Sequence, residues 1–546
     1  MPLNRKKIVA IIPDFILVFS LILLGVIYGY PEILSFEPQG QHHWRQTDCA
    51  SFAWNYYHGN INLFTPAMNN VLSNGKGQAV AEFPIIYWIG GLLYRLLGPD
   101  ILILRILNIS IVFSGLWVLF RLCKEVIDDI FWAFFIPILL FSSPFFVYYT
   151  NGFIPDPPAI ALCFWAWYFL FLHLKTEKKK YFSLAAAFFL LAALIKVSTA
   201  ISLVSLSSIL VLDKLFLSQS KNKHAFVFPL SLQFYIRRII GVSVLIIAWY
   251  FYASWYSTRF EYNHFTGIIR PLFQTPKEEI LRVLRIIGEQ LPYFYLPITH
   301  VFFAVVLVYI LWNFKKIRWQ FLLIPVFLCL GSLVYLALFF QLIGGHEYYH
   351  LVNLVAVTSI LITGSYLFNK ISPRVSQHRV TKSLLSLLLI INIFHARGQM
   401  LEYNDPQNQD NRENSAFYEK KFYSYLADLG LKDHHYVISI PDKSPNNTLY
   451  LMKKRGWSSF NNPRHFGDVM QKWTGGFGDI YLIISDSTLI QDSLLQPALY
   501  HKAGVYKDIH IYLLEKNRCS TWNIYSDQTS KERRRSASLS FFRMRA

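Results

Sequence analysis

Apolar residues, chiefly Leu, Ile, Phe, Val and Tyr, occur in long blocks along most of the chain. A helix needs roughly 17–25 such residues to cross a bilayer, and most of the blocks reach or approach that length. The pattern predicts twelve apolar helices, at residues 8–30, 83–98, 101–120, 130–149, 157–174, 181–195, 197–212, 239–256, 297–313, 320–344, 350–369 and 383–396. No small-residue cleavage site follows the first block, so we expect a retained helix rather than a removed signal peptide.

One block, 83–98, is predicted not to cross the membrane. It has only 16 residues, contains Arg95 and is bounded by Pro84 and Pro99. If it crossed, the lysines at 178–180 and the later basic loops would lie outside while the N-terminus lay inside, against the positive-inside rule. We therefore place it as a juxtamembrane or re-entrant helix on the outer face, which leaves eleven crossings and a cytoplasmic N-terminus.

The chain changes character after residue 396. Residues 397–516 are polar, with short apolar runs at 435–440, 480–484 and 509–514 between helical stretches, which predicts a small α/β domain on the exoplasmic side. Residues 517–546 are rich in Ser and Arg and are predicted to be a disordered tail. The predicted fold class is an all-α polytopic membrane protein over 1–396, with about eleven transmembrane helices and outer-face juxtamembrane helices, followed by that small α/β domain.

Composition and charge agree with this topology. Residues are 54% hydrophobic and only 16% charged, whereas soluble proteins carry about 25% charged residues, so a purely soluble enzyme is disfavoured. The net charge of +19 would suit a nucleic-acid partner in a soluble protein. Here 21 cations and five acids, +16 in all, fall in the predicted cytoplasmic windows 5–7, 121–129, 175–180, 213–238, 315–318 and 370–382. The positive charge therefore indicates topology and gives no support to nucleic acid.

The first outer loop combines Arg45 and Asp48 at the start of an aromatic helix. One interpretation is an interfacial helix with Trp and Tyr at headgroup depth. Against it, Arg45 and Asp48 stand where the helix enters an apolar zone, and a charge there is costly without a partner or a function.

Three further charges mark the outer ends of apolar blocks. Glu82 opens the second block, Asp156 precedes two prolines at a helix start, and Lys196 interrupts an apolar run. Asp156 has an alternative role as an N-cap, and Lys196 has the alternative of extending to the headgroups. Carboxylates and cations converging on one membrane face suit a substrate with a phosphate and a hydroxyl, because cations hold phosphate and a carboxylate takes a proton.

A polar cluster, His346-Glu-Tyr-Tyr-His350, separates two apolar blocks and includes Glu347 and Tyr349. The two histidines have an i, i+4 spacing that suits a metal, but with one acid nearby we favour hydrogen bonding to a polar substrate. Asn446-Asn447-Thr448 has the form of a glycosylation sequon, which is a weak signal by itself.

The order of several short motifs resembles a known family. They are His-Trp-Arg-Gln-Thr-Asp, Asn-Tyr-Tyr-His-Gly, Glu-Phe-Pro before an aromatic helix, Leu-Leu-Gly then Leu-Arg-Ile-Leu, and Gly-His-Glu-Tyr-Tyr. Together they resemble the C-type (GT-C) membrane glycosyltransferases, including the protein O-mannosyltransferase-like, aminoarabinose-transferase-like and rhizobial lipopolysaccharide glycosyltransferases. The resemblance covers roughly residues 1–370 and is strongest over 40–160.

The resemblance implies an inverting enzyme of the cell (inner or plasma) membrane. It would move a sugar from a polyprenyl-phosphate carrier to a hydroxyl of a glycolipid, polysaccharide or protein on the exoplasmic face. It implies that Asp48 is the catalytic base, and that the substrate contacts are Arg45, Glu82, Asp156, Lys196, His346, Glu347 and Tyr349. No cofactor is expected, although the carboxylates leave a divalent metal open.

Two departures and two alternatives accompany this interpretation. Many relatives have an adjacent Asp-Glu pair where this chain has Arg45-Gln46, and others have Lys where this chain has Phe83. A transporter or flippase of a lipid-linked or hydroxylated solute is the main alternative, but such proteins favour internal repeats, and we find none in the sequence. A non-catalytic exoplasmic assembly protein is the other.

Overall fold

The computed structural model describes residues 5–71, 75–80, 82–214, 228–260, 269–317, 319–408, 415–442, 444–458, 479–493 and 495–514. They belong to two compact units. The first, the helical unit, comprises Met1–Phe36, Val80–Arg259 and Asn263–Asp405. The second, the mixed unit, comprises Glu37–Ala79, Phe260–Tyr262 and Pro406–Ala546.

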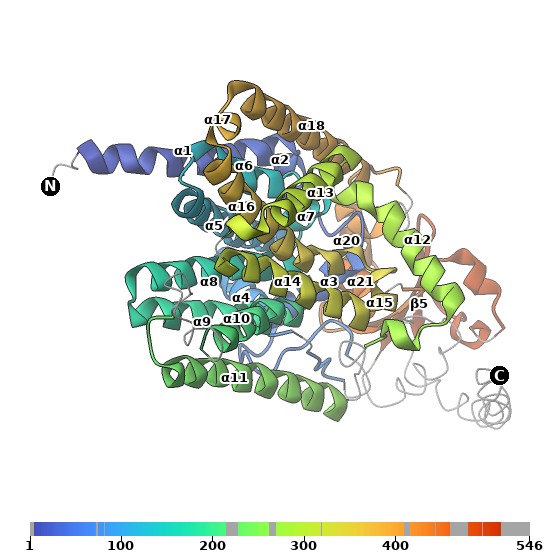
Figure 1. Ribbon diagram of the computed structural model, residues 1–546. Helices are drawn as coiled ribbons and strands as arrows, with labels where there is room; N and C mark the ends of the chain where they lie inside the picture. The colour runs from blue at the N-terminus through green and yellow to red at the C-terminus, as the bar shows by residue number, and fades with distance from the viewer. Residues whose placement is uncertain are drawn as a thin grey trace. The chain divides into compact units, whose positions relative to one another are not determined.

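The helical unit consists of α-helices and short 3-10 turns (Figure 1). Its α-helices are α1 (Arg5–Ile27), α2 (Tyr30–Ile33), α4 (Ile85–Leu97), α5 (Ile101–Ile127), α6 (Ile130–Leu140), α7 (Pro144–Asn151), α8 (Asp156–Thr176), α9 (Lys179–Ile195), α10 (Ala200–Leu212), α11 (Leu232–Arg259), α12 (Lys277–Phe294), α13 (Pro297–Trp312), α14 (Trp319–Leu338), α15 (Phe340–Ile343), α16 (Leu354–Ile371), α17 (Pro373–Ser376) and α18 (Arg379–Tyr403). The 3-10 turns are η1 (Val197–Thr199), η3 (Leu272–Gln274), η4 (Phe314–Lys316) and η5 (Glu347–Asn353).

Among the described residues, six helices are long and apolar enough to cross a membrane. Two bent pairs, α6 with α7 at 71° and α12 with α13 at 96°, raise the number to eight if each pair is one span. The polytopic all-α fold class is confirmed, and every predicted apolar block lies on a helix. Because α4 has 13 residues, it is about 20 Å long, short of the ~30 Å apolar core of a bilayer. The count of eleven crossings stays a prediction.

Close helix contacts occur within the helical unit, where α8 packs against both α5 and α9. At the crossing of α5 and α8, a Cβ added to Gly115 would lie 2.5 Å from the Cα of Ala161. Small residues permit this approach, which is how helices gain packing energy in an apolar solvent.

The mixed unit contains a five-stranded sheet in the order β2-β1-β3-β5-β4. The strands are β1 (Tyr436–Ile440), β2 (Gly456–Ser458), β3 (Ile480–Ile484), β4 (Lys502–Tyr506) and β5 (Ile509–Leu514), and the α-helices are α3 (His43–His58), α20 (Lys420–Asp428) and α21 (Asn447–Leu451). Short 3-10 turns occur at Ser415–Tyr418, Ser487–Gln491 and Gln496–Ala498. Strands β1, β2 and β3 are parallel, whereas β5 is antiparallel to β3 and β4.

The predicted α/β domain is confirmed, and its three apolar runs form β1, β3 and β5. The sequence did not predict β2, which has three residues, or β4, an edge strand with an irregular register between Lys502 and Gly504. The predicted domain boundary at 397 falls within α18. The predicted tail, 517–546, lies outside the described residues.

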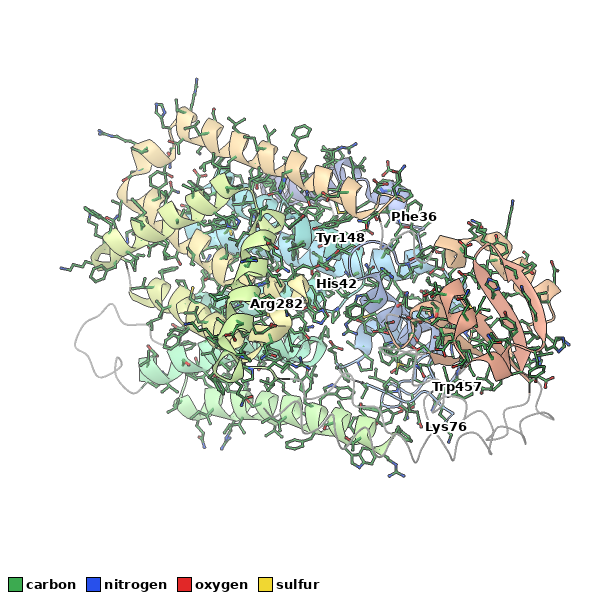
Figure 2. The ribbon with its side chains drawn as sticks, turned by 90° about the vertical axis from the view of Figure 1, so that its right-hand side faces the viewer. Phe36, His42, Lys76, Tyr148, Arg282 and Trp457 are labelled. Atoms are coloured by element: carbon green, nitrogen blue, oxygen red, sulfur yellow. The ribbon has the colours of Figure 1, made fainter. Side chains whose placement is uncertain are left out.

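A segment of the first loop completes this sheet. The N–H of Val71 donates to the carbonyl of Gly456 (2.8 Å), and the N–H of Gly456 donates to the carbonyl of Asn69 (3.1 Å). Val71 is fully buried in the same core as Ile438 and Trp457, the latter labelled in Figure 2. The first loop and the C-terminal region therefore share one hydrophobic core.

Substituting Gly456 should disrupt this junction. An alanine Cβ would lie 1.8 Å from the carbonyl oxygen of Val437, so the β1–β2 pair must separate. We expect Gly456→Ala to lower the free energy of unfolding by about 3 kcal/mol, measured by thermal unfolding of the purified protein. Gly241→Ala in α11 is the control, because a Cβ there meets nothing within 4 Å and alanine favours helix. Equal melting temperatures for the two variants would contradict the packing described.

Candidate active site

Lys196 lies at a break between two helices. It ends α9 with an extended backbone (φ −150°, ψ 111°) before the 3-10 turn η1. Its carbonyl oxygen accepts hydrogen bonds from the N–H (3.0 Å) and the Oγ1 (2.8 Å) of Thr199. The hydroxyl therefore satisfies a carbonyl at the break, which is costly to leave unpaired in an apolar setting.

The ammonium group of Lys196 lies among carboxylates and aromatic rings. Its Nζ is 3.1 Å from Oδ2 of Asp156 and 3.8 Å from Oε1 of Glu82. It also lies 5.1 Å from the ring centre of Tyr349 and 5.5 Å from that of Tyr348, within range for cation–π attraction. Lys196 is 8% exposed and Asp156 is 3% exposed. The ammonium thus contacts groups of the protein itself, and two of them, Asp156 and Tyr348, are buried.

Asp156 is the first residue of α8, and Pro155 occupies the N-cap position without a side-chain cap. The alternative role of Asp156 as an N-cap is therefore wrong. The prolines that follow it suit the first helical turn, where their missing N–H groups cost little. The positive end of the helix also favours a carboxylate there.

Glu82 is brought to Lys196 by backbone contacts of its neighbour. The N–H of Phe83 donates to the carbonyl of Leu194 in the last turn of α9 (2.9 Å). The Phe83 ring packs edge-on against Trp249 of α11 at 4.8 Å. Phe83 thus anchors the segment through an apolar contact and supplies no cation at the position where some relatives have lysine.

The polar cluster at 346–350 forms the start of η5. Glu347 is buried and accepts a 2.5 Å hydrogen bond from the hydroxyl of Tyr149. The His346 ring stacks on Tyr349 at 5.7 Å, whereas the His350 ring contacts Phe294 at 5.4 Å. The two histidines therefore have different neighbours. No group of three His, Cys, Asp or Glu side chains suited to a metal occurs among the described residues.

Two residues of α5 that the sequence analysis did not single out support this region. Buried Arg105 donates to the carbonyl of Asn151 (2.8 Å), and Asn108 donates to the carbonyl of Thr150 (3.1 Å). They hold the end of α7 just before the segment that leads to Asp156. A charge inside an apolar helix was the available signal for Arg105.

Asp48 and Arg45 belong to α3 in the mixed unit, and both are buried. Eleven of the sixteen residues of α3 are buried, polar ones included, which does not fit a helix lying on a membrane surface. Oδ1 of Asp48 accepts a 2.9 Å hydrogen bond from the side-chain amide of Asn446. No local pattern in the sequence indicates this partner.

Lys453 contacts Trp54 in the C-terminal half of α3. Its Nζ lies 2.9 Å from the carboxylate of Glu37, 3.7 Å from the ring centre of Tyr450 and 5.3 Å from that of Trp54 on α3. Burial lowers the pKa of Lys453, and Glu37 opposes this shift.

The predicted site residues thus occur in two groups. In the helical unit, Glu82, Asp156 and Tyr349 surround the Lys196 ammonium, and His346 stacks on Tyr349. Glu347 lies on the same 3-10 turn as Tyr349 and contacts Tyr149. In the mixed unit, Arg45 and Asp48 lie on one helix.

Comparisons with known proteins add to this geometry. Residues 81–237, which contain Glu82, Asp156 and Lys196, match the family described as dolichyl-phosphate-mannose-protein mannosyltransferase. ArnT from Cupriavidus metallidurans, in the apo state, is similar in structure with a TM-score of 0.59 and 12% identity, over 92% of this chain and 98% of that one. The chain has the fold of a C-type membrane glycosyltransferase.

A lower similarity, with a TM-score of 0.48 and 12% identity, links it to the Archaeoglobus fulgidus oligosaccharyltransferase, over 88% of this chain and 69% of that one. No curated protein matches the chain in sequence. The partial family match and the fold support the resemblance to GT-C glycosyltransferases, and the apolar helices suit a multi-pass membrane protein. The family resemblance predicted from the sequence is thereby confirmed.

Replacing Lys196 should destabilise the helical unit. Lys196→Met removes the ammonium from the buried carboxylate of Asp156 and the partly buried carboxylate of Glu82. Removing one partner of a buried pair costs about 3 kcal/mol. The double variant Lys196→Met/Asp156→Asn should recover part of this loss. Thermal unfolding in detergent measures both.

The matched control is Lys175→Met, which removes a similar ion pair from the surface, where Lys175 and Glu125 lie 2.5 Å apart with half-exposed side chains. Such pairs contribute ~1 kcal/mol or less. If Lys196→Met and Lys175→Met lowered the melting temperature equally, the buried cluster would not have the stabilising role described.

Proposed function

We propose that this GT-C protein is an inverting glycosyltransferase that transfers a sugar from a polyprenyl-phosphate carrier to an acceptor hydroxyl. The acceptor belongs to a glycolipid, a polysaccharide or a protein on the exoplasmic face of the inner or plasma membrane. The observation that carries the proposal is the buried ammonium of Lys196, held between Asp156 and Glu82 and beside two tyrosine rings.

Lys196 is the proposed contact of the carrier phosphate. A buried ammonium stabilises the negative charge that develops on a leaving phosphate more strongly than one in water does. Of its two carboxylate partners, Glu82 is more distant and more exposed, so a phosphate oxygen would replace Glu82 first and leave the 3.1 Å contact with Asp156. Asp156 would then keep the lysine oriented.

The remaining polar groups are proposed to bind sugar and phosphate. Glu347 and Tyr349 follow one another closely on η5, with His346 stacked on Tyr349. Carboxylate and ring hydroxyl groups form hydrogen bonds to sugar hydroxyls, and imidazole forms them to phosphate. Arg45, one helical turn before Asp48, is proposed to assist the phosphate.

Asp48 is the proposed general base. Its carboxylate takes the proton of the acceptor hydroxyl while that oxygen attacks the anomeric carbon, and the bond to the carrier breaks with both electrons going to the phosphate oxygen. A single displacement of this kind inverts the anomeric centre. The burial of Asp48 on α3 and its contact with a fixed amide support a positioned carboxylate.

No cofactor enters this proposal. The ammonium of Lys196 lies between the carboxylates of Asp156 and Glu82, where a cation would otherwise bind.

The proposal predicts that Asp48→Asn abolishes transfer while the fold persists. Losing a general base costs about 10²- to 10⁴-fold in turnover. We expect this loss in reconstituted membranes supplied with a panel of polyprenyl-phosphate sugars and acceptors, with donor consumption and labelled product both recorded. Asp508→Asn, an exposed acid of the β4–β5 turn, is the matched control and should retain turnover.

Unchanged turnover of Asp48→Asn would remove Asp48 as the base. Movement of intact carrier or free solute across the membrane, with no glycosidic bond formed, would favour the transporter alternative instead.

A further inference from the structure

The glycosylation-like sequence Asn446-Asn447-Thr448 is buried in the mixed unit. The three residues are 0%, 1% and 2% exposed, so no glycan can be attached to the folded protein there. They begin α21, which contacts α3 in the same compact unit. This motif therefore has a structural task rather than serving as a glycan acceptor.

Asn446 points its amide nitrogen at the proposed base. Nδ2 donates to Oδ1 of Asp48 at 2.9 Å. On the other side of the amide, Oδ1 accepts the backbone N–H of Asn70 at 2.8 Å. Because a backbone N–H can only donate, it must face the amide oxygen, and this fixes which end of the Asn446 amide faces Asp48.

The loop that carries Asn446 is itself held rigidly. The carboxylate of Asp442 accepts the N–H of Ser444 (3.0 Å), the N–H of Thr448 (2.9 Å) and the hydroxyl of Thr448 (2.6 Å). The side chain of Asn70 donates to the carbonyl of Pro445 at 3.0 Å. Hydrogen bonds therefore fix the loop around Asn446 and both ends of its side-chain amide, so that the amide keeps one orientation.

We propose that Asn446 is a positioning residue for catalysis: its amide holds the Asp48 carboxylate in one orientation and in its ionised form. A fixed N–H donor favours a carboxylate over a carboxylic acid, which cannot accept as strongly. The C-terminal region then supplies a part of the catalytic apparatus. The inference rests on the proposed function, since it requires Asp48 to be the base.

Buried charged or titratable residues also occur on both chain segments that form the contact. α3 carries His43 and Arg45, and the C-terminal region carries Asp442 and Lys454. The Asp442 carboxylate binds Thr448, and the Lys454 ammonium lies 2.9 Å from Asp433. These two are therefore engaged elsewhere, whereas Asn446 contacts the Asp48 carboxylate directly.

The test compares Asn446→Ala with Asn447→Ala in the reconstituted transfer assay. Asn447 is equally buried, but its side chain lies 3.4 Å from His43 and Thr47 and makes no hydrogen bond to Asp48 among those described. We expect Asn446→Ala to lower kcat about a hundredfold with little change in KM. The pH at which kcat is half-maximal should also rise by about one unit, because the Asp48 carboxylate has lost the amide donor that favours its ionised form.

Asn447→Ala is expected to keep the pH profile of the unchanged protein. Asn446→Ser, whose hydroxyl can still donate, should restore part of kcat and an intermediate profile. Thermal unfolding of each variant identifies any loss that comes from misfolding, in which case the serine variant decides the question. The inference is overturned if folded Asn446→Ala keeps the pH profile of Asn447→Ala, or if folded Asn446→Ser has a lowered kcat with an unmoved pH profile.

Different results would contradict the positioning role of Asn446 and the proposed function. If Asp48→Asn retains turnover, Asp48 is not the base and the proposed function must be revised. If Asp48→Asn is inactive while folded Asn446→Ala has an unmoved pH profile, only the positioning role of Asn446 is lost.

Discussion

The contact between the Lys196 ammonium and its two carboxylates is the constraint on which the helical unit depends. It joins the end of α9, the start of α8 and the segment before α4, and the tyrosines of η5 cover it. Each charge would be costly in an apolar interior by itself, and together they offset that cost. The arrangement therefore requires all these chain segments to be in place at once, so the site and the helix packing cannot form separately.

Polar side chains set the backbone around this cluster. Thr199 caps the carbonyl at the break after α9, and Arg105 and Asn108 hold the end of α7. Each supplies a donor to a carbonyl where a helix ends, and membrane helices have little water to do this. The backbone is irregular at these helix ends, where side chains of the protein supply hydrogen-bond donors. The charged residues lie at the same helix ends. This explains why the candidate site lies at helix ends and not in helix interiors.

Much of the fold could be predicted from sequence because lipid requires long apolar helices, and β1, β3 and β5 are short apolar runs in a polar region. Edge strand β4 and three-residue β2 lack such a pattern. Lys196 and Asp156 could be identified because a charge beside an apolar run is conspicuous. Asn446 could not: it is a neutral residue whose role depends on a contact 398 positions away, and no local spacing encodes that.

The pairing of residues 69–71 with β2 has a consequence for the order of events during synthesis. Asp48 and its partner Asn446 are separated by 398 residues. At ribosomal rates of about 5–20 residues per second, roughly 20 to 80 s pass between their appearance. During that time the first loop has neither its sheet edge nor its amide partner. In a nascent or truncated chain that lacks residues 446–458, the first loop would therefore have neither the β2 pairing nor the Asp48–Asn446 hydrogen bond.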